Sequence, residues 1–192
     1  MPRWGPNAAG RLHDAALTLF TEQGYEQTTV AQIAERAGLT ERSFFNHFTN
    51  KREVLFGHTS EHQRQVVARE VASRPAATPP LEAVLHGLQA AADEVLEDFR
   101  ELAAPRRRII DATPELQERE EAKRAALTAA IADALRERGL DADTALLTAG
   151  LGLLVQQAAE QQWVRPDEKR PLRDLLPAAL ESLRGVVDGT TA

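Results

Sequence analysis

Cysteine is absent from the sequence, and aromatic residues make up only 5% of its 192 positions. The lack of cysteine excludes a disulfide framework, a cysteine nucleophile, and a zinc or iron–sulfur site built on thiolates. Long apolar runs are also lacking, because the longest one, residues 145–155, is far shorter than the roughly 20 residues that cross a bilayer. The N-terminus has neither the apolar stretch nor the cleavage site of a secretory signal, so we expect a cytoplasmic protein.

Catalytic motifs are missing as well. We find no nucleophile motif, no glycine-rich phosphate loop and no pair of carboxylates that the pattern would place in one cleft. His58 and His62 are four residues apart, but glutamate does not follow the first histidine directly, as it does in the zinc-protease motif. We therefore expect no enzyme activity, no cofactor and no metal.

The net charge of −6 is at first sight unfavourable for a nucleic-acid partner, but it is unevenly distributed. Residues 1–56 contain six Lys and Arg and six Asp and Glu, whereas the remaining 17 basic and 23 acidic residues follow, so the whole excess lies there. A neutral N-terminal part on an acidic body is compatible with a small DNA-binding head.

Alanine and leucine are abundant and alternating β-branched runs are missing, which predicts an all-α fold of about nine helices. Helix start and stop signals divide the chain. The expected helices run from a cap at Asn7 to Gly24, from Thr29 to 37, from Thr40 to 48, from a cap at Asn50 to Ser73, over 81–99, from Pro105, from Thr113-Pro114 to Gly139, from Asp141 or Asp143 to Trp163, and over 172–187.

Residues 29–48 have the pattern of a helix-turn-helix. Ala34 provides a small residue where the second helix would cross the first, and Gly38 provides a residue that tolerates a left-handed backbone in the turn. Leu39 and Phe44 would fill the angle between the two helices. Spacing alone leaves two interpretations open, a DNA-binding module or a generic helical corner used for interaction.

A denser set of motifs resembles a known family. These are Thr28-Thr29-Val30-Ala31-Gln32-Ile33-Ala34-Glu35-Arg36-Ala37-Gly38-Leu39-Thr40, then Ser43-Phe44-Phe45-Asn46-His47-Phe48 and Asn50-Lys51-Arg52-Glu53-Val54-Leu55. From about Ala15 to Leu55 the chain resembles the DNA-binding domain of the tetracycline-repressor (TetR) family. Beyond residue 56 the resemblance is one of architecture only. It implies an N-terminal three-helix helix-turn-helix domain, residues 1–52, and a C-terminal helical domain for ligand binding and dimerisation, residues 53–192.

The resemblance implies that residues 40–47 form the recognition helix in the major groove. Arg42 can grip guanine O6 and N7 together or contact a phosphate. Asn46 can pair with adenine or remain solvated, and Glu41 can accept from cytosine or favour the helix N-terminus. The DNA-contacting residues expected are Thr29, Thr40, Glu41, Arg42, Ser43, Phe45, Asn46, His47 and Lys51.

Thr29 and Lys51 each begin an expected helix, where free N–H groups suit a phosphate. Lys51 adds a point charge there. Phe45 stands where the family commonly has a tyrosine whose hydroxyl meets a phosphate, so that contact is lost and only packing is expected. Arg3 can enter a minor groove or belong to a disordered tail.

Residues 145–155 are apolar on nearly every face of their helix, which predicts a homodimer interface rather than an internal core alone. Gly150 and Gly152 lower the propensity of that helix by about 1 kcal/mol each, a cost that a close helix approach can offset. The last helix adds an apolar stripe expected to match it: Leu172, Leu175, Leu176, Ala179, Leu180, Leu183 and Val187.

The ligand site is less clearly marked. Val54, His58, His62 and Val66 follow one another at steps of four, so the histidines should share a face with apolar residues. They can hydrogen-bond within the core, as the spacing favours, contact a ligand, or pair on a metal. Residues 106–108, all arginine, can receive an anionic ligand or pair with Glu101 and Asp111. The expected ligand-contacting residues are His58, His62, Val66, Phe99 and Trp163.

Taken together, these features predict a DNA-binding transcription regulator that is dimeric on palindromic operator DNA. The first hypothesis is a repressor released by an unknown small-molecule effector. The second is a regulator with no such effector, controlled by a protein partner or by its abundance.

Overall fold

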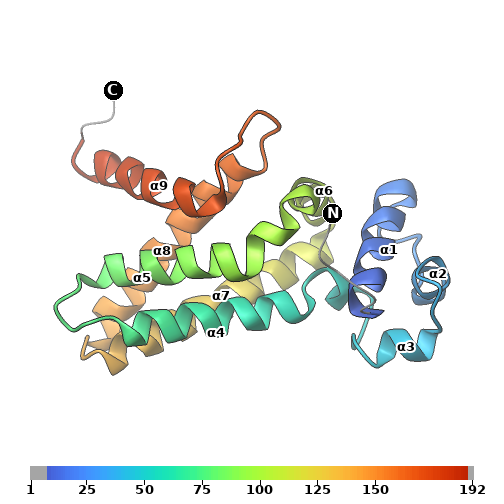
Figure 1. Ribbon diagram of the computed structural model, residues 1–192, viewed down its shortest axis with the longest axis horizontal. Coiled ribbons are helices and arrows are strands. Elements are labelled where there is room, and N and C mark those ends of the chain that lie inside the picture. Colours follow the sequence, from blue (N-terminus) through green and yellow to red (C-terminus); the bar gives the residue numbers. More distant parts are fainter. Residues whose placement is uncertain (1–7, 190–192) are drawn as a thin grey trace. The chain divides into compact units, whose positions relative to one another are not determined.

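The computed structural model describes residues 8–189, except for the side chain of His58, and in this part of the chain it contains nine α-helices and no strand (Figure 1). The all-α prediction is confirmed. The helices are α1 (Ala8–Gln23), α2 (Val30–Arg36), α3 (Glu41–Phe45), α4 (Gly57–Ser73), α5 (Pro80–Ala91), α6 (Arg100–Ala112), α7 (Pro114–Glu137), α8 (Ala142–Trp163) and α9 (Leu172–Val187). The expected cap Asn7 and the arm residue Arg3 lie outside the described residues.

The chain separates into two compact units. The first contains the residues up to Ser60 and also Glu101–Ala122, and the second contains Glu61–Arg100 and the residues from Lys123 onward. The inclusion of Glu101–Ala122 in the first unit was not anticipated from the sequence. The functional division expected at residue 52 stays a prediction.

Local signals set the ends of the helices in the first unit as expected. Gly24 ends α1 with a φ of 86°, and Gly38 turns the chain between α2 and α3 with a φ of 65°, both in the left-handed region that glycine tolerates. Thr29 and Gln32 form the predicted capping box at α2. The Thr40 side chain accepts from the Ser43 N–H and caps α3.

The helix expected from Asn50 to Ser73 is divided. Asn50 does accept from the Glu53 N–H, but residues Arg52–Leu55 form a separate 3₁₀ turn, and α4 begins only at Gly57. Gly57 has a φ of 28°, and a Cβ there would lie 3.0 Å from the Phe48 ring. The packing of Phe48 therefore selects a glycine at the break, which a local capping pattern does not reveal.

The helix expected over 81–99 is also wrong in its second half. After α5 the chain forms a π turn, η2 (Ala92–Leu96), and a 3₁₀ turn, η3 (Glu97–Phe99). Helix α6 then begins at Arg100 and contains Pro105, which was expected to start it. Because Pro105 is only the sixth residue of α6, it removes one early hydrogen bond without ending the helix.

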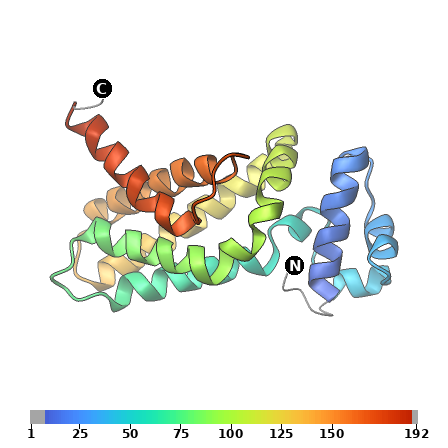
Figure 2. The same cartoon turned by 45° about the horizontal axis from the view of Figure 1, so that its top comes forward.

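Helices α5, α8 and α9 pack against one another in the second unit (Figure 2). A Cβ added at Gly152 of α8 would overlap the Val84 side chain of α5, so Gly152 permits a close approach inside the unit. The α9 stripe that was expected to face a partner is largely internal instead: Leu172, Leu175, Leu176 and Leu180 are buried. The prediction of a partner-facing stripe is wrong for these four residues.

No helix within residues 8–189 has the length and apolarity needed to span a membrane.

Candidate nucleic-acid interface

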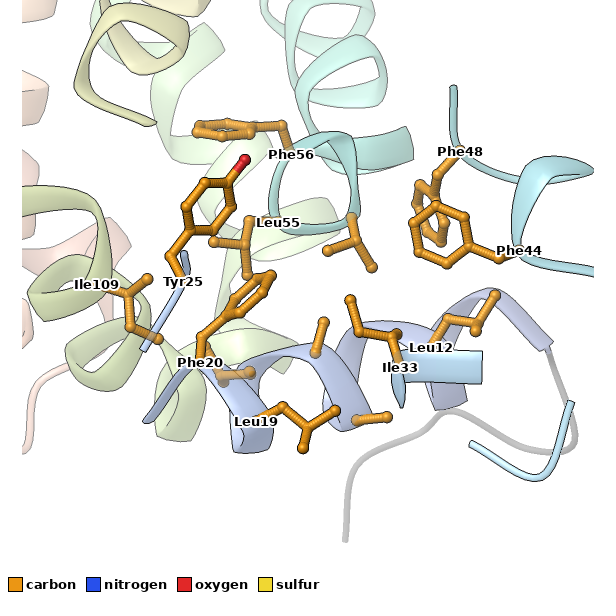
Figure 3. Close-up of a cluster of buried hydrophobic side chains, with 14 of the residues drawn as sticks. Leu12, Leu19, Phe20, Tyr25, Ile33, Phe44, Phe48, Leu55, Phe56 and Ile109 are labelled. Atoms are coloured by element: carbon orange, nitrogen blue, oxygen red, sulfur yellow. The ribbon is translucent and has the colours of Figure 1, made fainter. Parts of the chain in front are cut away.

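Helix α3 is held by large aromatic side chains on its inner side. Phe44 is fully buried and Phe48 is 5% exposed, with their ring centroids 5.5 Å apart. They belong to one apolar cluster with Leu12 of α1 and Ile33 of α2 (Figure 3). Because α3 packs against both α1 and α2, its orientation within the first unit is fixed by packing rather than by its own short length.

The outer side of α3 carries the predicted DNA-contacting residues. Glu41, Arg42, Asn46 and His47 are exposed, and Ser43 is half-buried. The helix is shorter than expected, since it ends at Phe45, with Asn46 as its C-cap and His47 in the following turn. The sequence thus indicated the correct surface, but the expectation of a helix through His47 is wrong.

Phe45 differs from its prediction. Its side chain is 56% exposed, and its ring meets Phe44 edge to face at a centroid distance of 5.5 Å. The expectation that only packing remains for this residue is therefore wrong, because most of the ring faces outward. An exposed phenylalanine beside Arg42 and Asn46 gives this surface an apolar contact of the kind that thymine methyl groups accept.

Of the two predicted phosphate-positioning residues, Thr29 begins a helix as expected, whereas Lys51 precedes the 3₁₀ turn Arg52–Leu55 and not α4. Thr29 is exposed at the N-cap of α2. The Lys51 Nζ donates to the Tyr25 carbonyl at 2.7 Å and lies 3.9 Å from the centre of the Tyr25 ring. An ammonium has three donors, so this bond positions the charge and leaves donors for another acceptor.

A cluster around Phe56 was missed by sequence reasoning. The guanidinium groups of Arg106 and Arg119 lie 5.0 and 5.2 Å from the Phe56 ring. Arg119 donates two hydrogen bonds to Glu53, at 2.7 and 3.0 Å, and Arg106 donates to the Leu55 carbonyl and to Glu120. Arg107 pairs with Asp111, which is one of the two interpretations given for the arginine run. Arg106 contacts the Phe56 ring, the Leu55 carbonyl and Glu120 rather than an open anion site.

Tyr25 connects to the same part of the unit. Its hydroxyl donates to Glu115 at 3.1 Å, and its ring lies in the buried cluster together with Phe56 and Ile109 (Figure 3). Burial, followed by this hydrogen bond, raises the pKa of the Tyr25 hydroxyl above its ordinary value. No local signal could have shown this contact, because 90 positions separate the two partners.

The predicted ligand-contacting residues belong to different environments. Val66 and Trp163 are buried, Phe99 is half-buried and His62 is exposed, while the side chain of His58 lies outside the described residues. The core interpretation of His62 is wrong. The buried stripe of α4 is centred on Gln63 and Val67, and Val66 lies at its edge. His62 is four residues before Val66, which places it a further 40° around the helix from the centre of this stripe.

Comparison with known proteins gives the same assignment in both halves of the chain. A model of the bacterial regulatory proteins of the tetR family matches residues 12–57, and a model of the MftR C-terminal domain matches residues 78–188. The HTH-type transcriptional regulator TcmR of Streptomyces glaucescens is 38% identical over 107 residues, or 53% of this chain. This match spans less than half of TcmR, 46% of its length.

A relative that matches along most of its length is the putative mycofactocin biosynthesis transcriptional regulator MftR of Mycobacterium tuberculosis. It is 29% identical over 182 residues, which cover 92% of this chain and 89% of MftR. Among solved structures, FadR from Bacillus subtilis in complex with stearoyl-CoA aligns over 91% of this chain and 96% of its own, with a TM-score of 0.60 and 22% identity. That likeness concerns the fold. The chain therefore belongs to the tetR family of bacterial regulatory proteins.

Proposed function

We propose that this regulator is a repressor that binds operator DNA through α3 and is released by a small-molecule ligand. The observation that carries the DNA-binding part is the outer side of α3, where Arg42, Phe45 and Asn46 are exposed above a buried aromatic anchor. Such a surface combines a bidentate donor, an apolar contact and an amide, the three kinds of side chain that read base edges. Lys51 and Thr29 supply phosphate contacts at its margin.

Ligand release is supported by the size of the rest of the chain and by its relatives. The family model of the N-terminal part ends at residue 57, so most of the chain lies beyond the segment matched to the DNA-binding domain. The similar FadR structure from Bacillus subtilis contains stearoyl-CoA, and KstR2 of Rhodococcus jostii, 39% identical over 70 residues, is named a transcriptional repressor. Control by a protein partner or by abundance is the alternative, and it predicts no ligand effect on DNA binding.

The functional species in this proposal is a homodimer on palindromic DNA. Among the apolar side chains of α8, Leu146, Leu147 and Leu154 are 59%, 67% and 56% exposed. Within the described part of the chain, nothing lies within 4 Å of a Cβ built at Gly150, so this face is open to a second copy. A dimer would place its recognition helices about 34–36 Å apart, or a multiple of that spacing, to meet successive major grooves.

Release requires that the ligand prefers a dimer with a different separation of its recognition helices. Helix α4 is the proposed lever, because it begins at Gly57, close to Lys51 in the sequence, and continues through Val66 in the second unit. A hundredfold preference corresponds to about 2.7 kcal/mol of coupling. By reciprocity, operator DNA must weaken ligand binding by the same factor.

The test begins with nuclease protection of the DNA upstream of the protein's own coding region. We expect a protected palindrome with the natural protein, weakened protection with Phe45→Ala, and unchanged protection with the matched surface control Ala129→Gly on α7. Small molecules that bind the protein are then titrated calorimetrically with and without operator. Equal ligand affinities in the two titrations would refute release by that ligand, and absence of any protected site would refute operator binding there.

A further inference from the structure

Three side chains of the second unit are themselves buried and also carry a polar atom with no hydrogen-bond partner among the described residues. The atoms are Nε2 of Gln63 on α4, Oε1 of Gln156 on α8 and the indole Nε1 of Trp163, also on α8. Their residues are 1%, 6% and 6% exposed, so water does not reach these side chains freely. Buried polar groups are normally paired, and each exception needs an explanation.

The two groups on α8 share one side of that helix, because Gln156 and Trp163 are seven residues, or about two turns, apart. Ala159, which is 1% exposed, lies between them in the sequence and occupies little space. Gln156 Nε2 donates to Glu160 Oε1 at 2.6 Å. Since a carboxylate cannot donate, this bond fixes the amide and leaves its oxygen as the unsatisfied atom. The indole N–H of Trp163 can only donate.

Helix register brings Gln63 and Gln156 to the same level of α5. Gly87 of α5 lies against Val67 and Val71 of α4. A short connection makes α4 and α5 antiparallel, so Gln63, one turn before Val67, is level with Ala91. Gly152 of α8 lies against Val84 and Leu88, and Trp163 lies near Arg100, so α8 runs parallel to α5 and Gln156 is level with residues 88–92.

At that level α5 becomes the π turn η2, and its inward residues are small. Ala91 and Ala92 are buried, as is Val95 one turn later. Single π turns inside helical segments are frequent at functional sites. The irregular backbone and the small side chains of η2 therefore lie level with Gln63 and Gln156, and Trp163 follows about two turns further along α8.

We infer that the second unit binds a neutral, mainly apolar ligand beside η2, held by hydrogen bonds from Trp163 and Gln63 and to Gln156. This inference rests on the proposed ligand release and names the chemical class of the ligand. Two donors and one acceptor face the site, so the ligand carries a hydroxyl or carbonyl oxygen, and a hydroxyl can satisfy both kinds of partner.

A charged ligand group does not fit this set of partners. The polar residues that are buried in the described part of the second unit, Gln63, Thr148 and Gln156, are all uncharged, so an anionic group placed among them would lack a counter-charge and would lie near the Glu160 carboxylate. Arg100 is the nearby cation over the Trp163 ring, but it donates to Glu97 and to the carbonyls of Glu168 and Arg170. A hydroxyl or carbonyl is therefore favoured over a carboxylate.

The test uses the 192-residue chain with Trp4→Phe, so that Trp163 is the one remaining tryptophan in it. The probes are 1-decanol, 2-decanone and decanoate at pH 8. We expect 1-decanol to shift the Trp163 emission and to bind at least tenfold more tightly than decanoate, with 2-decanone in between. No shift with either neutral probe, or tighter binding of decanoate, would overturn the inference.

Calorimetry with variants then locates the site. Trp163→Phe and Gln156→Leu should each weaken 1-decanol about threefold to tenfold, the loss of one hydrogen bond. The matched control Gln161→Leu, at an exposed glutamine of the same helix, should leave its affinity unchanged. Thermal melting confirms that each variant is folded, and if Gln156→Leu fails to fold, Trp163→Phe and Gln63→Leu decide.

Failure of this inference is distinguishable from failure of the proposed function. If another effector releases operator DNA and its affinity does not respond to Gln156→Leu or Trp163→Phe, the site is wrong while ligand release stands. If 1-decanol binds with the expected variant pattern but leaves operator binding unchanged, the site stands and its role in release is refuted.

Discussion

Gly150 and Gly152 lie two residues apart in α8, and the structure predicts opposite results for the same substitution at the two positions. Replacing glycine by alanine inside a helix stabilises it by about 1 kcal/mol. At Gly150 a Cβ meets nothing within 4 Å among the described residues, so Gly150→Ala should raise the free energy of unfolding of the single chain by about that amount. At Gly152 the new Cβ overlaps the Val84 side chain.

Overpacking of this kind costs about 1–3 kcal/mol, which offsets or exceeds the gain in helix propensity. Gly152→Ala should therefore be less stable than Gly150→Ala by about 1–3 kcal/mol. For a chain of this length, each kcal/mol shifts the melting midpoint by about 2–4 °C. The difference between the two variants is measurable by thermal denaturation monitored by circular dichroism.

Val84→Ala provides the control for the cause. It removes the methyl group that a Cβ at Gly152 would overlap, so the double variant should be more stable than the sum of the single effects implies. Additive effects, or equal stabilisation by both alanine substitutions, would refute the close packing of α5 on α8. Because self-association raises apparent stability, all melts are compared at one protein concentration with the mass measured alongside.

Three further predictions concern association, DNA contacts and acid. Leu154→Glu should convert a dimer into a monomer of 21.1 kDa, as measured by light scattering. Ala129→Glu makes an equal charge change at an exposed residue of α7 and should leave the dimer intact. A natural protein that is already monomeric would contradict the proposed interface. Arg42→Ala should cost about 1–3 kcal/mol of binding free energy on the operator and relax the preference for one base pair. Lys51→Ala should weaken binding to all DNA sequences alike and reduce the salt dependence of the affinity by about one unit of slope. If both variants lose affinity uniformly across sequences, Arg42 is a phosphate contact. Hydrogen bonds from the Arg170 side chain and backbone lower the pKa of Glu168 to about 2, so its stabilising contribution is complete above pH 4.5 and is lost as the pH falls toward 2. Glu168→Gln should flatten the fall of the melting midpoint in that range, and an unchanged pH profile would exclude this carboxylate as a contributor.

Features decided by neighbouring residues could be predicted from the sequence. The capping box at Thr29, the cap at Thr40, the left-handed glycine at position 38 and the cap at Asp141 each depend on a few adjacent side chains, and all four are present. Helix α9 also begins and ends at the expected residues, although Pro171 before it makes no side-chain capping hydrogen bond.

Features decided by distant contacts could not be predicted. The break at Gly57 depends on Phe48, and the division after α5 depends on how three helices meet in the second unit. The pairing of Glu53 with Arg119 joins positions 66 apart, which no periodic pattern signals. The exposed surface of α3 was identified because the family motif is dense there. The environment of His62 was not, because the expected helix ran unbroken from Asn50, and the break at Gly57 changes which residues of α4 face inward.

The cluster around Phe56 has a consequence for exchanging DNA-binding heads between related regulators. A chimera that carries over only the residues up to Ser60 would join a foreign counterpart of Phe56 and Glu53 to the native Arg106 and Arg119. It would also separate Tyr25 from Glu115, its hydrogen-bond acceptor. The exchangeable module is therefore discontinuous, and a working head swap must transplant Glu101–Ala122 together with the N-terminal segment.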